Sequence, residues 1–216
     1  LPLLKERLRF PGGGSAAALS RDGKRLAIGT LSGDAGIWDA DTGKELVSFR
    51  GKHVLAVQGI AFSPDEKHVA TASADGTARI WNVSTGEESA SFTRHRGQVS
   101  GIAYSADGSE VATSGWDGVV RIWDPSTGAE IRSFGADGGL PLVGLAWSPS
   151  GARIASLPVG NGVVVWDLAT GAEIARFSPD RARTLSLAFS PDSTRVVTGM
   201  DDGTARIWVA ATGVEL

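Results

Sequence analysis

The sequence predicts an all-β protein built from five copies of one four-stranded antiparallel unit. Two markers that recur at a common spacing indicate this fold class. A tryptophan ends one strand in every copy, at intervals of 43, 42, 43 and 42 residues: Trp38, Trp81, Trp123, Trp166 and Trp208. A turn serine recurs at the same intervals: Ser20, Ser63, Ser105, Ser148 and Ser190. Periods of about 40–45 residues with several short strands are typical of blades stacked around an axis.

The second copy shows the unit most clearly, in the stretch SPDEKHVATASADGTARIWN that covers 63–82. A polar turn precedes a β-branched run, and a tight turn at 74–76 precedes a second strand that ends in Trp81. This order predicts an antiparallel hairpin. A Thr-Gly pair follows each tryptophan, and a phenylalanine closes the next strand at Phe49, Phe92, Phe134 and Phe177. Each copy therefore has strands a, b, c and d, at about 57–62, 68–73, 77–82 and 88–92 in the second copy.

The five blades are expected at about 12–50, 51–93, 94–135, 136–178 and 179–216, within a single domain that spans 1–216. Residues 5–10 read KERLRF, which is similar to the KELVSF that ends at Phe49. We interpret 1–11 as an isolated outer strand, with a short amphipathic helix as the alternative. This strand could complete the last blade and close a five-blade ring. The other possibility, which the start at Leu1 and the end at Leu216 favour, is an excerpt of a longer array.

Strand c ends in a Trp-Asp pair in three copies, at 38–39, 123–124 and 166–167, and in Trp-Asn or Trp-Val in the other two. In this respect the chain resembles the WD40-repeat family over essentially all of 12–216. The resemblance implies a β-propeller, most often closed by about seven blades. It also implies that bacterial arrays of this kind are often joined to a catalytic or signalling domain. One fold hosts many activities, so the resemblance names no partner.

Composition excludes several classes of function. The net charge of −3 and the pI of about 5.6 argue against a dedicated nucleic-acid binder. The chain has no cysteine, which excludes disulfides and thiolate metal sites. No apolar run approaches about 18 residues, so no membrane span is expected. We expect a cytoplasmic protein, and the excess of arginine over lysine suggests a bacterial source.

The sharpest polar constellation is His53, Ser73, Asp75 and Trp81. In the family that the chain resembles, such residues form a buried hydrogen-bonded chain, which is a structural role. A Ser-His-Asp catalytic triad is the alternative, and the position of Ser73 in the middle of a strand argues against it. The third copy keeps His95, but the residues expected at the hydroxyl position elsewhere cannot form the link: Gly115, Pro158 and Met200. We therefore expect the complete network in the second copy alone.

No catalytic or metal site is expected. The turn that starts at Asp39 resembles half of a calcium loop, but it lacks the distal glutamate, so an ordinary turn is preferred. The three histidines lie in different contexts, which makes a metal cluster improbable. We predict no cofactor and no enzyme activity.

The resemblance places the b–c turns and d–a loops on one rim, where partners commonly dock. Trp116 stands on a tight b–c turn, either exposed or folded against a neighbouring loop. Charged residues share this rim: Lys52, Arg94, Arg96, Arg181, Arg183 and Asp201. A mixed-charge rim around one aromatic residue predicts a non-catalytic scaffold for a protein or peptide partner. The alternative is an enzyme or small-ligand binder that uses the central channel, although the a strands supply almost no acid–base groups.

Overall fold

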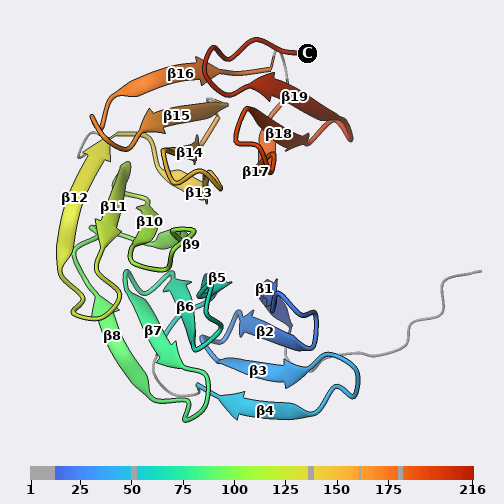
Figure 1. The fold of residues 1–216 in the computed structure, drawn as a ribbon, viewed down its shortest axis with the longest axis vertical. Helices are drawn as coiled ribbons and strands as arrows, with labels where there is room; N and C mark the ends of the chain where they lie inside the picture. Colours follow the sequence, from blue (N-terminus) through green and yellow to red (C-terminus); the bar gives the residue numbers. More distant parts are fainter. Residues whose placement is uncertain (1–12, 50–52, 136–138, 161, 180–181) are drawn as a thin grey trace, which may run out of the picture.

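The computed structural model describes residues 13–49, 53–135, 139–160, 162–179 and 182–216, and every regular element in them is a β-strand. Five antiparallel sheets stand side by side around an axis, each with strand a innermost (Figure 1). The predicted all-β class and the blade-like arrangement are confirmed. No helix in the described residues has the length and hydropathy needed to cross a bilayer. The outer strand predicted within 1–11 lies outside the described residues.

The sheets follow the chain in order. The first contains β1 (Gly14–Leu19), β2 (Arg25–Thr30), β3 (Ala35–Asp39) and β4 (Glu45–Ser48). The second contains β5 (Val57–Phe62), β6 (His68–Ser73), β7 (Ala78–Asn82) and β8 (Glu88–Phe92). The third contains β9 (Val99–Tyr104), β10 (Val111–Gly115), β11 (Val119–Trp123) and β12 (Glu130–Gly135). The fourth contains β13 (Leu142–Trp147), β14 (Arg153–Pro158), β15 (Val163–Asp167) and β16 (Glu173–Phe177).

The fifth sheet has three strands, β17 (Thr184–Phe189), β18 (Arg195–Met200) and β19 (Ala205–Val209). An isolated antiparallel bridge between Trp208 and Glu215 occupies the place where the other sheets have strand d. The prediction of four strands per blade is thus correct for the first four sheets. In the second sheet, the predicted strand bounds agree with the structure except that strand c begins at Ala78 instead of residue 77.

Side chains close the turns that the sequence predicts. The Ser63 hydroxyl donates to Asp65 over 2.7 Å and accepts from the His68 amide over 3.0 Å, which joins both ends of the a–b turn. Glu66 has a φ of 58°, in the left-handed region that favours glycine, and Gly108 holds the same turn position in the third blade with a φ of 76°. The turn chemistry therefore repeats, while the residue at its left-handed position varies.

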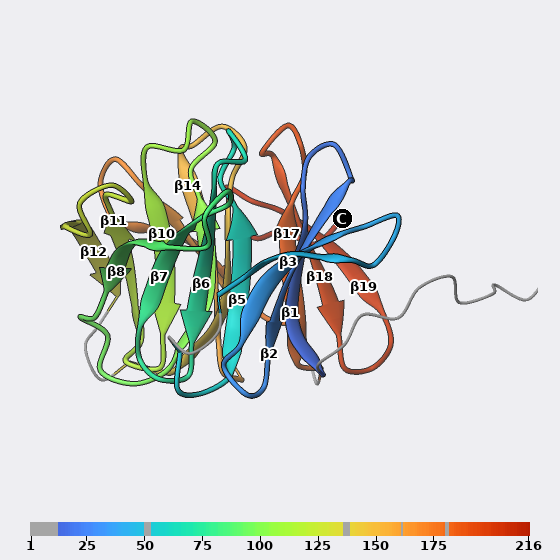
Figure 2. The same ribbon diagram turned by 90° about the horizontal axis from the view of Figure 1, so that it is seen from below.

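Figure 2 shows the blades edge on, with the turns gathered at two opposite edges. We call the edge formed by the b–c turns and the blade-to-blade loops the bc rim. The opposite edge, formed by the a–b and c–d turns, is the ab rim. Because strands alternate in direction within each sheet, every blade contributes two connections to each rim.

The core lies between the blades, since each sheet presents one apolar face to the next sheet. The phenylalanine that ends strand d packs against the strand-c tryptophan of the following blade. The ring centroids lie 5.1 Å apart in Phe49–Trp81, 4.9 Å in Phe92–Trp123, 5.4 Å in Phe134–Trp166 and 4.8 Å in Phe177–Trp208. Three of these four ring pairs are stacked. Such pairs add to the stabilisation that comes from apolar burial, which is the larger of the two effects.

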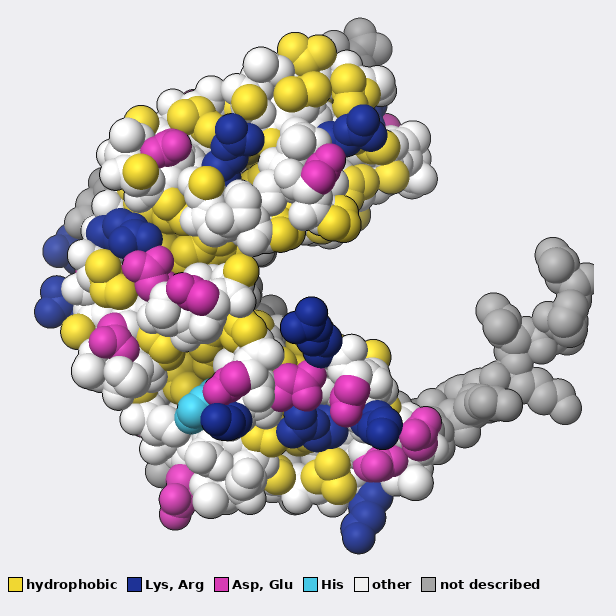
Figure 3. All heavy atoms as spheres, in the orientation of Figure 1, with side chains coloured by type: hydrophobic (Ala, Val, Ile, Leu, Met, Phe, Trp, Pro, Cys, Tyr) yellow, Lys and Arg dark blue, Asp and Glu magenta, His cyan; other side chains and the backbone are white. Residues whose placement is uncertain are grey.

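The five blades form an open arc in the described residues, and Figures 1 and 3 show a wedge between the first and fifth blades. The exposure of equivalent residues agrees with this arrangement. Ile122 in β11 is 0% exposed because the fourth blade covers it, whereas Ile207, at the same place in β19, is 42% exposed. Among the residues that the structure describes, no further blade covers this face of the fifth blade.

Removing these two equivalent side chains tests the arc. We expect Ile122→Ala to lower the free energy of unfolding by about 2–5 kcal/mol, because it opens a cavity in a packed junction. Ile207→Ala is expected to lower it by less than about 1 kcal/mol, because much of that side chain is already in water. Urea unfolding of both variants would measure the difference, and equal losses would show that the end face is covered in solution.

Candidate functional site

The bc rim carries apolar side chains at one repeated position, the residue directly after strand b. Leu31, Trp116 and Val159 stand there in the first, third and fourth blades and are 70%, 46% and 47% exposed. The second and fifth blades have Ala74 and Asp201. This repeated position thus places three large, exposed apolar side chains on one edge of the molecule.

Backbone hydrogen bonds hold this position against the neighbouring blade-to-blade loop. The Trp116 amide donates to the Gln98 carbonyl over 2.9 Å, and the Val159 amide donates to the Pro141 carbonyl over 2.8 Å. Ala74 and Asp201 make the corresponding bonds. Trp116 is therefore held on a turn that is bonded to the neighbouring loop, and the residue is 46% exposed.

The sequence reasoning missed further apolar groups on the same rim. Val54 and Leu55 are exposed in the loop before the second blade, and Leu140 is exposed in the loop before the fourth. The available signal was a large aliphatic residue inside a loop that is otherwise polar.

The predicted charged residues of the rim are only partly within the described residues. Arg94, Arg96 and Arg183 are described and lie in the blade-to-blade loops, whereas Lys52 and Arg181 lie outside the described residues. Arg183 Nε contacts the Asp201 carboxylate over 3.1 Å, and the Asp201 carboxylate also accepts from the Arg183 amide over 2.8 Å. These two predicted residues therefore pair with each other.

Behind the rim, the second blade contains a buried hydrogen-bonded chain. Asp75 accepts from His53 Nδ1 over 2.9 Å, and His53 Nε2 lies 2.8 Å from the Thr71 hydroxyl. The Trp81 indole N–H donates to the same hydroxyl over 2.8 Å. The predicted histidine, aspartate and tryptophan are brought together, but the predicted serine was wrong as their link.

Ser73 has a different task because it lies two residues further along the strand, at its loop end. Its hydroxyl donates to the Leu55 carbonyl over 3.0 Å and accepts from the Asp75 amide over 3.1 Å. Residues two apart in a strand share a face, so the pattern alone could not choose between Thr71 and Ser73. The His53 ring lies deep enough in the junction for its Nε2 to reach the Thr71 hydroxyl.

The expectation that the third blade lacks the network was also wrong. His95 contacts Asp117 over 3.0 Å through Nδ1, and its Nε2 lies 2.7 Å from the Thr113 hydroxyl. The Trp123 indole donates to that hydroxyl over 2.7 Å. Gly115, which the sequence reasoning placed at the hydroxyl position, corresponds to Ser73, so its lack of a side chain leaves the chain of bonds intact.

The remaining blades keep part of the arrangement. Trp166 donates to Ser156 over 2.8 Å, and Trp208 donates to Thr198 over 2.9 Å. The predicted hydroxyl positions Pro158 and Met200 were therefore wrong in the same way, by two residues. In the first blade, Ile28 stands at the equivalent position and supplies no hydroxyl. The tryptophan anchor is thus nearly general, whereas the His–Asp part belongs to the second and third blades.

The bonds favour a neutral histidine in both networks. With the hydroxyl accepting from tryptophan, its own hydrogen is free to donate to His53 Nε2, and Nδ1–H donates to Asp75. Burial lowers the pKa of His53 and of His95, and the facing carboxylates of Asp75 and Asp117 oppose this shift without overcoming it. Burial acts to raise the pKa of Asp75, but hydrogen bonds from Thr77 and His53 outweigh it, so that pKa is lowered.

A model of the WD domain, G-beta repeat, matches residues 43–82, 86–124 and 172–209, which together make up more than half of the chain. The chain belongs to the WD40 repeat family. Repeats of this family generally mediate protein–protein interaction, and the family is generally non-catalytic. The matched residues include parts of all five blades.

Among solved structures, this WD40 chain is similar to a crystal structure of the computationally designed Ika8 protein, with a TM-score of 0.77 and 28% sequence identity. The similarity covers 94% of this chain and 60% of the designed chain, so this chain spans less than two thirds of the length of that protein. No curated protein matches the chain.

The WD40 networks do not form a catalytic site in this geometry. The Thr71 and Thr113 hydroxyls are fully buried and already bonded to an indole, so neither is presented to a substrate. Asp39 accepts from the Thr42 amide and hydroxyl, both over 2.7 Å, which makes it the cap of an ordinary c–d turn. Within the described part of the chain, no group of three or more histidine, aspartate or glutamate residues is placed to hold a metal.

Thr71→Val tests the corrected network. We expect it to lower the free energy of unfolding by about 2–3 kcal/mol, because it leaves both the Trp81 N–H and His53 Nε2 without a partner in a buried site. Ile28 at this position in the first blade shows that a β-branched apolar side chain fits. The matched control Thr198→Val removes one tryptophan partner and should cost about 1 kcal/mol. Equal losses in urea unfolding would contradict the shared hydroxyl.

The lowered histidine pKa values predict a pH dependence. Below about pH 6.5 the unfolded chain binds protons at His53 and His95 that the folded chain resists, so stability should fall as the pH drops through this range. Urea midpoints measured at several pH values would give the slope. His95→Asn should reduce that slope, and a slope that is unchanged in this variant would show that His95 takes up its proton equally well in the folded state.

Proposed function

We propose that this WD40 chain is a non-catalytic scaffold whose bc rim binds a protein or peptide partner. The observation that carries the proposal is the exposed ring of Trp116, held by the backbone on a fixed turn. An aromatic side chain kept in water on a rigid element is the usual form of an interface hot spot, because little conformational entropy is lost when it is covered.

The apolar neighbours on the rim support the same function. Leu31 and Val159 flank Trp116 along the arc of blades, and Val54 and Leu140 lie on the adjoining loops. Exposed apolar groups that gather on one edge typically mark an interaction surface, whereas single ones scattered over a surface need no explanation. A partner that follows the curve of the rim would meet several blades.

The charges on the rim suit a polar border around this apolar centre. Arg94 and Arg96 are exposed beside the third blade, and the Arg183–Asp201 pair lies at the fifth. An ion pair that is this open to solvent stabilises the fold little, so its members are available for exchange with a partner's charges. A binding surface with mixed charge favours a protein over a nucleic acid.

The use of the central channel for catalysis or ligand binding has less support. Apart from Gln58 in β5, the inner strands offer mainly small or apolar side chains, as in β5 (VQGIAF), β9 (VSGIAY) and β13 (LVGLAW). Chemistry in the channel needs converging carboxylates, histidines or a metal. The cytoplasmic location, the bacterial source and the linked domains stay predictions from the sequence.

Selection of peptides from a random displayed library tests the rim. We expect Trp116→Ala to weaken binding of the selected peptides by about 30-fold or more, since truncation of a hot-spot tryptophan removes about 2 kcal/mol or more. Charge reversal at Arg94 and Arg96 should change the salt dependence of binding. Titration calorimetry gives both values.

Ile131→Ala, at a residue of the outer strand β12 that is 47% exposed, is the matched control and should leave these affinities unchanged. Thermal unfolding of each variant verifies that the fold is kept. Peptides that bind Trp116→Ala as tightly as the original chain would overturn the assignment of this rim.

A further inference from the structure

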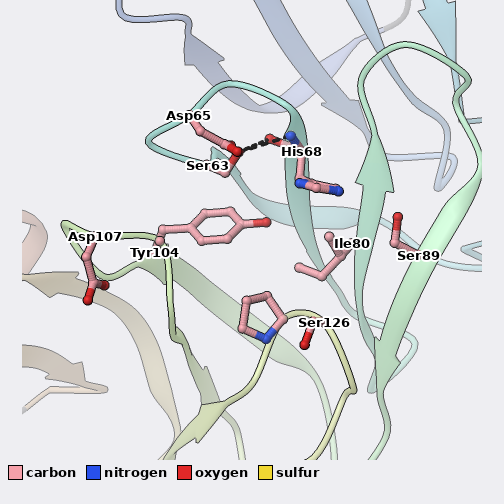
Figure 4. Close-up of a pocket in the computed structure, with 10 residues that line it drawn as sticks. Ser63, Asp65, His68, Ile80, Ser89, Tyr104, Asp107 and Ser126 are labelled. Atoms are coloured by element: carbon pink, nitrogen blue, oxygen red, sulfur yellow. Dashed lines mark hydrogen bonds between the residues drawn. The ribbon is translucent and has the colours of Figure 1, made fainter.

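A pocket of about 440 Å³ opens on the ab rim, at the junction between the second and third blades. Its wall from the second blade includes Asp65, His68 and Ser89, and its wall from the third blade includes Tyr104 and Gly108 (Figure 4). The volume lies within the range of about 300–1,000 Å³ that ligand pockets have. The pocket is on the edge opposite Trp116, so it is a second site.

The equivalent positions in the neighbouring junction, between the first and second blades, hold different side chains. There Arg25 at the start of β2 places its guanidinium carbon 5.7 Å from the centroid of the Phe62 ring. Arg25 Nη2 pairs with the Glu66 carboxylate over 2.5 Å, and Nη1 donates to the Glu66 carbonyl over 3.5 Å. An arginine side chain of this protein thus lies in that junction, over an aromatic ring and beside an anion.

The repeat places shorter side chains at three of these positions in the next junction. His68 stands where Arg25 does, Gly108 stands where Glu66 does, and Ser89 stands where Leu46 does. The ring under the guanidinium is kept, because Tyr104 stands in the place of Phe62. The pocket is therefore lined by shorter side chains at the positions where the preceding junction has Arg25, Glu66 and Leu46.

The pocket presents groups that suit a cation. The Tyr104 hydroxyl oxygen is buried and has no hydrogen-bond partner among the described residues. Burial, with a further contribution from the Asp65 charge, raises the pKa of Tyr104, so the phenol stays protonated and neutral. Asp65 is ionised, because hydrogen bonds from Ser63 and the Lys67 amide lower its pKa. The ring, the phenol oxygen and the carboxylate are each partners that a guanidinium accepts.

The fold does not require the Tyr104 hydroxyl. Phe62 and Phe189 end strand a in the second and fifth blades, so a phenyl ring satisfies the packing at this position. A buried hydroxyl without a partner is unfavourable to stability. A ligand that donates to it removes this penalty on binding.

We propose that this pocket binds the side chain of an arginine from a partner peptide. The guanidinium stacks on the Tyr104 ring, pairs with Asp65 and donates to the phenol oxygen. The aliphatic part of the arginine packs against Ile80 and Pro125, which line the same pocket. This site is independent of the bc rim, and it recognises a basic peptide where the rim recognises apolar groups.

Charge favours a cationic guest over an anionic or neutral one. The described residues that line the pocket include Asp65 and Asp107, and no lysine or arginine is among them. The Asp107 carboxylate turns away from the Tyr104 hydroxyl in Figure 4, so it adds to the field without a direct bond. Lys67 Nζ lies 3.8 Å from Asp65, but both side chains are largely exposed, and such a pair is easily displaced.

Binding can be followed through Tyr104 itself, because it is the one tyrosine of the chain. Labelled tyrosine then gives a single set of ring signals in nuclear magnetic resonance. We expect the capped tripeptide Gly-Arg-Gly to shift these signals saturably, with a Kd on the order of 1 mM. The same peptide with citrulline, which has the shape of arginine without the charge, should bind at least about tenfold more weakly.

Two substitutions separate this proposal from a general attraction to acidic surface. His68→Arg supplies the missing side chain from within, as Arg25 does in the preceding junction, and should abolish peptide binding while the fold is kept. Tyr104→Phe, followed through the Gly108 amide signal, should weaken binding about fivefold or more, with thermal stability unchanged or raised. Trp116→Ala should leave this binding unchanged, whatever it does at the other rim.

The proposal is overturned if the arginine peptide gives no saturable shift, if citrulline binds equally well, or if His68→Arg still binds. It is supported if binding depends on the charge, on the Tyr104 hydroxyl and on the empty space. Loss of binding in Trp116→Ala would place the peptide on the bc rim and would also count against the pocket.

Discussion

The structure depends on the contact between a strand-d phenylalanine and the strand-c tryptophan of the next blade. A four-stranded sheet has two faces and cannot bury both by itself, so each blade needs a neighbour. The Phe92–Trp123 stack at 4.9 Å shows how one blade covers the next. In this apolar layer the Trp123 indole N–H needs a hydrogen-bond acceptor, and the Thr113 hydroxyl provides it.

The same anchor extends to the surface in two blades. In the second blade the chain of bonds runs from Trp81 through Thr71 and His53 to Asp75, which stands on the b–c turn. Because the turn is tied to the core, the residues around it are held in place without support from a partner. A rigid edge that presents Trp116 and its apolar neighbours is therefore a direct consequence of how the blades are joined.

Differences between blades, more than their similarity, distinguish one part of the surface from another. A position that every blade fills in the same way contributes to packing, as the strand-c tryptophans do. Trp116 differs from Ala74 and Asp201 at a position where packing makes no demand. In the same way, His68 and Gly108 break the pattern set by Arg25 and Glu66, and a pocket opens where the pattern is broken. WD40 repeats generally mediate protein–protein interaction. The exposed Trp116 and the pocket beside Tyr104 are the features on which the two proposed binding sites, at opposite rims, are based.

The sequence alone determined the strands, the five copies and the order a to d, because turn residues and a period of 42–43 residues are properties of neighbours along the chain. It also identified His53, Asp75 and Trp81 as one group. Only the tertiary structure decided that Thr71 is their link, since Ser73 shares its strand face and depth in the junction separates them. The open arc and the pocket beside Tyr104 were likewise decided in three dimensions, because both arise where one blade meets, or fails to meet, another.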